Sequence, residues 1–197
     1  MVKKGEFGYI AKRKKRTIVM SFMILLIAVI IFVAGLLLNK MSKANIFTIL
    51  AVLCVLPWAK QIVALVVLFP YHSVSRERYE KVKTAVKGRI DGDTDSDDPE
   101  PVRLYTDLVI TSSEKIMNLD FVVVGYGQVI ALVGKKGQDV AYIRQYLSKG
   151  VAQWGDYKVK IVESEKLFLK DVEGLQPNQT NPEERENVNS YLRSLIV

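Results

Sequence analysis

The stretch Thr17–Leu38 reads TIVMSFMILLIAVIIFVAGLLL and contains no charged residue. A helix rises about 1.5 Å per residue, so a run of this length matches a hydrocarbon core of about 30 Å. A basic segment precedes it, as in a signal peptide, but the apolar run is too long for one and no small-x-small cleavage site follows. We therefore predict a transmembrane helix over 17–38.

A second apolar run, Ile46–Phe69, follows after a short polar turn. Two spans joined this closely form a helical hairpin, which we place over 17–70, so both of its ends lie on the same side of the membrane. The turn contributes only Lys40 and Lys43, whereas 1–16 and 76–89 are rich in Lys and Arg. Because basic flanks stay inside, we expect a multi-pass protein of the cell membrane with both termini in the cytoplasm.

The composition of the chain limits its chemistry. It has 197 residues, 49% of them hydrophobic, and a net charge of +7. The excess of positive charge lies in residues 1–16 and not in the part after the hairpin, which argues against a dedicated nucleic-acid-binding protein. The single cysteine, Cys54, excludes an intramolecular disulfide framework and a Cys-based zinc site. We predict no cofactor and no metal site.

Four segments follow from these patterns: a basic cytoplasmic tail (1–16), the transmembrane hairpin (17–70), a juxtamembrane helix with an acidic linker (71–101), and a cytoplasmic α/β domain (102–197). The tail is expected to attract anionic lipid headgroups through Lys12, Arg13, Lys14, Lys15 and Arg16. The helix over 74–90 either lies along the membrane surface or packs on the following domain. The linker 91–101 alternates aspartates, but Ser96 and Val102 stand at the sixth and twelfth positions, where a calcium-binding EF-hand loop requires Gly and Glu. We therefore expect a solvated, extended segment.

The α/β domain is predicted from alternating and helical apolar spacings. We expect a small mixed sheet in the element order α-βββ-α-β-α, beginning with the juxtamembrane helix. The expected elements are strands over 102–110, 119–125, 129–133 and 157–162, and helices over 138–154, 164–174 and 182–196. In the first strand Val102, Leu104, Thr106, Leu108 and Ile110 are expected on one face, and in the first of these helices Trp154 is expected on the buried stripe.

Residues 120–135, DFVVVGYGQVIALVGK, resemble the centre of a NERD-type nuclease-related domain of the PD-(D/E)xK fold. The resemblance implies that Asp120 is the first metal-binding acid and Lys135 the catalytic lysine. Val133 stands where the family has its second acid, so the implied metal site lacks a carboxylate ligand. Ordinary roles explain both residues as well, with Asp120 beginning a strand and Lys135 solvated after one, and we prefer those roles.

The whole layout also resembles a group of small bacterial two-span membrane proteins of no established activity, some of which carry an O-linked GlcNAc transferase-like label. The sequence has neither the 34-residue helical repeats nor the glycine-rich phosphate loop that would support such an activity. The only histidine, His72, stands at the edge of the second span, so a Ser-His-Asp arrangement cannot be assembled.

Lys60 is an unusual residue, because it lies 14 positions into the second span, beside Pro57, Trp58 and Gln61. Three interpretations stay open. Its ammonium snorkels to the headgroups, it joins Gln61 in polar contacts of a homo-oligomeric bundle, or it serves an ion or substrate path.

Three functions are consistent with these patterns. The first is a non-enzymatic, membrane-anchored protein that presents its α/β domain to a protein partner or to its own copies. The second is a small oligomeric channel or transporter component built around Lys60. The third is a membrane-tethered, nuclease-like enzyme with an incomplete site. Because no complete catalytic set is present, the sequence favours the first.

Overall fold

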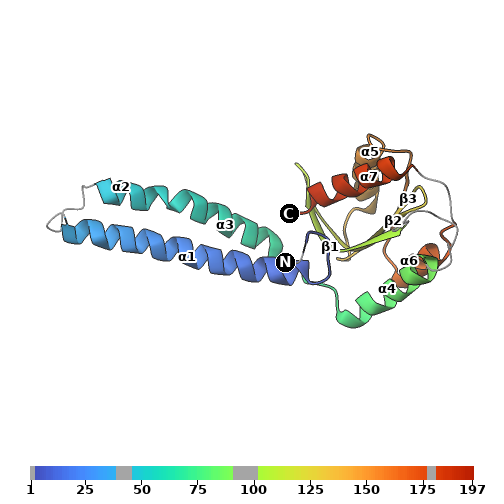
Figure 1. The fold of residues 1–197 in the computed structure, drawn as a ribbon, viewed down its shortest axis with the longest axis horizontal. Helices are drawn as coiled ribbons and strands as arrows, with labels where there is room; N and C mark the ends of the chain where they lie inside the picture. Colours follow the sequence, from blue (N-terminus) through green and yellow to red (C-terminus); the bar gives the residue numbers. More distant parts are fainter. Residues whose placement is uncertain (1–2, 39–45, 91–101, 177–180) are drawn as a thin grey trace. The chain divides into compact units, whose positions relative to one another are not determined.

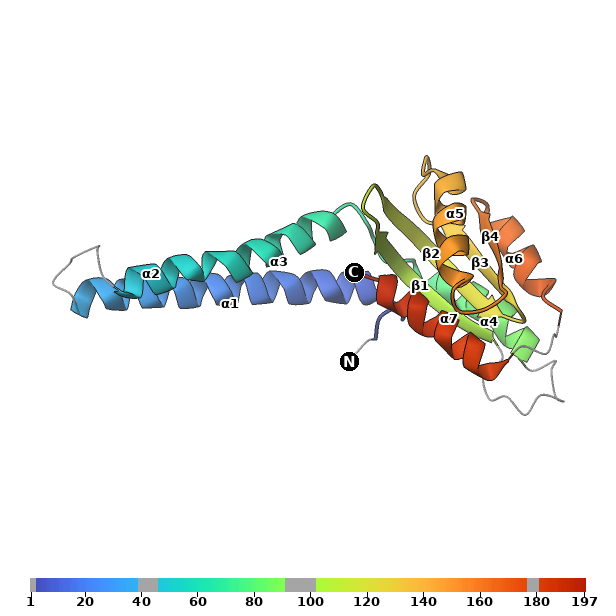
Figure 2. The same cartoon turned by 90° about the horizontal axis from the view of Figure 1, so that it is seen from above.

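The computed structural model describes residues 3–38, 46–90, 102–176 and 181–197, so the polar turn and the acidic linker lie outside the described residues. The chain divides into two compact units. The hairpin unit comprises Ile10–His72, and the α/β unit comprises Met1–Tyr9 with Ser73–Val197. Figures 1 and 2 show the elements of both units. The first nine residues thus group with the α/β unit, whereas the sequence suggested a separate tail over 1–16.

The hairpin unit consists of helices α1 (Tyr9–Leu38), α2 (Ile46–Leu53) and α3 (Val55–Leu68). The stretches Tyr9–Leu38 and Ile46–Leu68 are each long and apolar enough to cross a membrane. Helix α1 begins eight residues before the predicted span, so the basic residues 12–16 are helical.

The second apolar run bends at Cys54, between α2 and α3. Cys54 N–H donates to the Leu50 carbonyl at 3.2 Å, and the Trp58 N–H donates to the Cys54 carbonyl at 3.4 Å. Pro57 has no N–H to donate to the carbonyl of Leu53, so one bond of the helical ladder is missing at this point. The proline therefore accounts for the break one turn before it.

Packing within the hairpin unit buries small and polar side chains of α1. Thr17, Ser21 and Gly35 are buried, while the large apolar residues between them are mostly exposed. On the facing helices Ala51 and Leu68 are buried. Small residues at a helix contact let the two backbones approach closely, which is the usual packing of helices in lipid.

The α/β unit is built on one four-stranded sheet in the order β1-β2-β3-β4. Strands β1 (Val102–Thr111), β2 (Ile116–Gly125) and β3 (Gln128–Val133) form an antiparallel meander, and β4 (Lys158–Val162) pairs with β3 in parallel. The turn between β2 and β3 consists of Tyr126 and Gly127, both with positive φ, as a two-residue hairpin turn requires. The predicted mixed sheet is confirmed.

Helices cover both faces of the sheet (Figure 1). One face packs against α5 (Val140–Val151) and α7 (Pro182–Leu195), and the other against α4 (Arg76–Ile90) and α6 (Glu165–Glu173). Val82 and Val86 of α4 are buried in the second of these cores. The apolar side of α4 thus packs on the sheet, as the second of the two interpretations of this helix expected.

The expectation that the even residues of β1 share one face is wrong. Val102 belongs to the core under α4 and α6, whereas Leu108 and Ile110 belong to the core under α5 and α7. The faces exchange at Asp107, whose φ of +58° breaks the alternation, and the opposite strand is irregular at the same level, between Leu119 and Phe121. A bulge inserts one residue and therefore moves the following side chains to the other face.

The predicted burial of Trp154 is also wrong. Helix α5 ends at Val151, and the Trp154 side chain is 45% exposed. The apolar spacing continued past the end of the helix, but Gly155 follows and the chain turns there towards β4.

Candidate functional site

Lys60 and Gln61 lie side by side in the sequence of α3 but differ in exposure. Lys60 is exposed and Gln61 is half-buried. Within the described residues, the Lys60 ammonium has no hydrogen-bond or ion-pair partner. Of the two predicted polar residues, the charged one, Lys60, therefore lies on the outer surface of the hairpin unit.

Lys14, one of the five predicted lipid-facing cations, closes the end of α3. Its Nζ donates to the carbonyl of Phe69 at 2.9 Å and to that of Tyr71 at 2.5 Å, and it lies 5.8 Å from the Phe69 ring centroid. A cation at a helix C-terminus satisfies carbonyls that have no partner within the helix. Lys14 thus joins the two arms of the hairpin, whereas Lys12, Lys15 and Arg16 are exposed and Arg13 is half-buried.

The N-terminal segment, residues 3–9, is built into the α/β unit. The Gly5 carbonyl accepts the Thr106 N–H of β1 at 2.8 Å, and the Phe7 ring stacks on Tyr79 of α4 with centroids 4.6 Å apart. The Tyr9 side chain is buried in the core, and its hydroxyl donates to the Val197 carbonyl at 3.0 Å. From the sequence this segment was expected to be part of a charged tail. The aromatic residues and glycines between its lysines could have indicated that the segment packs against the domain.

The C-terminal residues cover the same edge of the sheet. Ile196 forms an antiparallel bridge with Ile110, and the Val197 N–H donates to the Val109 carbonyl at 3.1 Å. Lys4 Nζ donates to the Ile196 carbonyl, which ties the two termini together. An uncovered edge strand is a template for aggregation, and here both termini protect β1.

The second connection to the hairpin unit also attaches to β1. The Val74 N–H donates to Asp107 Oδ1 at 2.9 Å, and this bond is buried. The two segments that continue into the hairpin unit are therefore bonded to neighbouring residues, Thr106 and Asp107. Both segments that lead to the hairpin unit thus bond to β1 at Asp107, where its backbone is irregular, or at the residue before it.

Asp120 lies at the bulge of β2 and forms an ion pair with Arg78 of α4, at 2.7 Å between Oδ2 and Nη1. Arg78 Nε also contacts Glu165 of α6 at 2.6 Å. Burial alone would lower the pKa of Arg78, but its hydrogen bonds to Glu165 and Asp120 raise it overall. One guanidinium thus joins α4, β2 and α6, and the network keeps Arg78 charged.

The nuclease-like arrangement would need Asp120, Val133 and Lys135 around one metal ion. Instead Asp120 is paired with Arg78, Val133 belongs to the core under α5 and α7, and the Lys135 side chain is exposed. Among the described residues, no group of three His, Cys, Asp or Glu side chains could hold a metal ion. Asp120 therefore has a structural partner in this fold, and the nuclease-like role stays a prediction.

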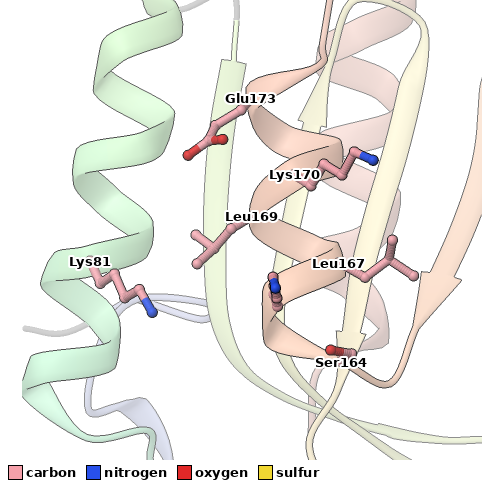
Figure 3. Close-up of a pocket in the computed structure, with 7 residues that line it drawn as sticks. Lys81, Ser164, Leu167, Leu169, Lys170 and Glu173 are labelled. Atoms are coloured by element: carbon pink, nitrogen blue, oxygen red, sulfur yellow. The ribbon is translucent and has the colours of Figure 1, made fainter.

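A groove of about 680 Å³ lies along α6 and reaches α4 (Figure 3). Three of its lining residues are lysines: Lys81, Lys166 and Lys170. Figure 3 shows Lys81 of α4 across a gap from Leu169 and Glu173 of α6. Ser164 is the only hydroxyl among the lining residues, without a histidine or a second acid beside it. The lining thus combines three lysines and two leucines with one serine and one glutamate.

Comparison with known proteins adds no family to this geometry: no protein-family model matches the chain, and no curated protein or solved structure is significantly similar to it.

Proposed function

We propose that this chain is a non-enzymatic membrane protein. Its hairpin unit spans the cell membrane with both termini in the cytoplasm, and its α/β unit binds a protein partner at the inner membrane face. One observation carries the proposal. In the described residues the exposed large apolar side chains lie in 18–69, with only three exceptions, Ile116, Trp154 and Leu167. Water strongly disfavours an apolar surface of this extent, and lipid does not.

The exposure of the two apolar helices argues for lipid around them. An apolar helix of a water-soluble protein is buried in a core, yet almost none of the apolar window of either helix is buried here. The bonds of Gly5 and Val74 to Thr106 and Asp107 support the other part of the proposal, because they order the two segments of the α/β unit from which the chain continues into the hairpin unit. The groove along α6 supplies the binding surface, and the geometry of the described residues favours neither the channel nor the nuclease alternative.

Cysteine labelling tests the topology. In a Cys54→Ser background, Ser42→Cys places a thiol in the predicted outer turn and Ser113→Cys places one in an exposed loop of the α/β unit. A membrane-impermeant maleimide is expected to label Ser42→Cys in intact cells and Ser113→Cys only after permeabilisation. Labelling in the reverse order, or extraction of the protein from membranes by carbonate, contradicts the proposal.

Photocrosslinking in cells tests the binding surface. A photoreactive residue at Leu167 of the groove is compared with one at Trp154, which is similarly exposed, at 45% against 44%. We expect a discrete adduct from position 167 alone, which disappears with Lys166→Glu and Lys170→Glu. Equal adducts from both positions, or none from either, would contradict a partner at this groove.

A further inference from the structure

The exposed charge of Lys60 has no partner in the part of the chain that the structure describes. It stands on α3, 14 residues after Ile46 and eight before Leu68. An ionisable residue inside a membrane is costly, and such residues almost always face a partner or a water-filled cavity. The hairpin unit offers Lys60 neither, since the residue is on its outer surface.

Snorkelling does not bring this ammonium to water. The nearer end of the second apolar span, at Leu68, lies eight residues away, which is about 12 Å along a helix. The four-carbon stem of a lysine reaches about 6 Å, and the Cα–Cβ bonds of a helix tilt towards its N-terminus. For Lys60 that direction leads away from the nearer end, towards one about 21 Å away along the axis.

A second copy of this chain cannot neutralise Lys60 either. No Asp or Glu occurs between Phe7 and Arg76, a stretch that includes both apolar runs. Copies that met at this face would bring one lysine against another, and like charges repel strongly where water is excluded. A carboxylate at this depth must therefore come from a different protein.

We propose that the exposed face of α3 around Lys60 docks a transmembrane helix of another protein that carries an Asp or Glu at the same depth. The ion pair that forms there costs less than two isolated charges in lipid. This inference rests on the proposed membrane insertion of the hairpin unit, and it names a second contact of the anchored protein, within the membrane.

Association with synthetic helices in vesicles tests the docking site. The full chain, carrying Trp154→Phe, is reconstituted in phosphatidylcholine vesicles, whose neutral surface gives the basic tail no anionic lipid to bind. Energy transfer is measured to three labelled leucine-rich transmembrane peptides that differ at one central position, which is Glu, Gln or Leu. We expect the Glu peptide to associate at least tenfold more tightly than the Leu peptide, with the Gln peptide between them.

Variants of Lys60 identify the contact. Lys60→Met should reduce binding of the Glu peptide to the level of the Leu peptide, and Lys60→Arg should preserve it. Equal binding by the wild-type chain and Lys60→Met overturns the inference.

Two further outcomes also overturn it. Self-association of the wild-type chain as strong as its binding to the Glu peptide would make a second copy the occupant. Modification of Lys60 by a membrane-impermeant amine reagent, mapped by mass spectrometry, would show that it reaches water. Failure of the proposed membrane insertion is recognised separately: with Trp154 replaced, Trp58 is the only tryptophan, and brominated lipids must quench it if the hairpin unit is inserted.

Discussion

The hairpin unit and the α/β unit use the same apolar residue types in opposite ways. In the α/β unit nearly all large apolar side chains are buried in two layers, one on each side of the sheet. In the hairpin unit the small polar residues Thr17 and Ser21 are buried, while Phe22, Leu26 and their neighbours are exposed. Burial of large apolar side chains therefore accounts for the packing of the α/β unit, whereas close contact of helices at small residues accounts for that of the hairpin unit.

The largest expected effect compares two phenylalanines. Phe121 is fully buried in the α/β unit and Phe22 of α1 is 72% exposed. Phe121→Ala should lower the unfolding free energy of the α/β unit by about 3–5 kcal/mol, because it removes apolar burial and leaves a cavity. Phe22→Ala should leave that free energy unchanged. Denaturant-dependent proteolysis of the full chain measures both, and equal losses would mean that the two units share one core.

The next effect compares two exposed leucines. Leu26 of α1 is 60% exposed and Leu167 of α6 is 44% exposed. Leu26→Asp should cost about 2.5–3.5 kcal/mol of insertion free energy, because it places a charge at the centre of a span. Leu167→Asp should change the stability of the α/β unit by no more than about 0.5 kcal/mol, as at other surface positions. The membrane-integrated fraction of glycosylation-tagged chains measures insertion, and normal integration of Leu26→Asp would place α1 in water.

A third, smaller effect concerns the N-terminal segment, and two glycines provide a matched pair. Gly5 and Gly8 have φ values of +81° and +77°, so alanine is strained at either position. A Cβ at Gly5 would lie 2.6 Å from the Tyr105 ring, whereas a Cβ at Gly8 meets nothing within 4 Å. Strain should lower the unfolding free energy of both alanine variants by about 1 kcal/mol. The clash with Tyr105 should lower that of Gly5→Ala by about 1–3 kcal/mol more.

Hydrogen exchange at the Thr106 N–H, which donates to the Gly5 carbonyl, reports the same contact. Gly5→Ala should accelerate this exchange more than Gly8→Ala does. Equal exchange in the two variants would show that the segment does not hold the edge of β1.

The smallest effect is the response to acid, which should come from the α/β unit alone because 7–76 contain no carboxylate side chain. A hydrogen bond from Lys115, and then one from the Tyr142 N–H, lower the pKa of Asp139 below 3.8. The stability that this carboxylate contributes is therefore present above that pH and lost as the pH falls through its folded-state value. Asp139→Asn should flatten the dependence of stability on pH below 3.8. If the stability of the Asp139→Asn variant depends on pH as strongly as that of the wild-type chain, Asp139 does not contribute to the acid response.

Much of the fold follows from local patterns. The two apolar runs, the strands and the order of the helices are encoded by apolar spacing and by helix-ending residues, and the structure has them within a few residues. Asn181 caps α7, with its side chain accepting the Glu183 N–H, as its place before Pro182 predicts. Period and capping depend on residues three or four positions apart, so the sequence alone reveals them.

The candidate site was less predictable, because its contacts join residues far apart in the chain. Asp120 resembles the first acid of a nuclease motif, but its partner Arg78 stands 42 positions earlier and the contact depends on how α4 packs. The face exchange in β1 depends on the backbone at Asp107, and no spacing rule marks an aspartate as a position of positive φ.

Composition and period alone predict two long apolar helices, a mixed sheet and a stretch from Phe7 to Arg76 without a carboxylate side chain. They do not predict that Gly5 and Val74 both bond to β1, that the Lys14 ammonium binds the carbonyls that follow α3, or that Lys60 faces outward. A hydrogen bond or an exposed face depends on where two distant segments come to lie, and local residue preferences do not encode that position.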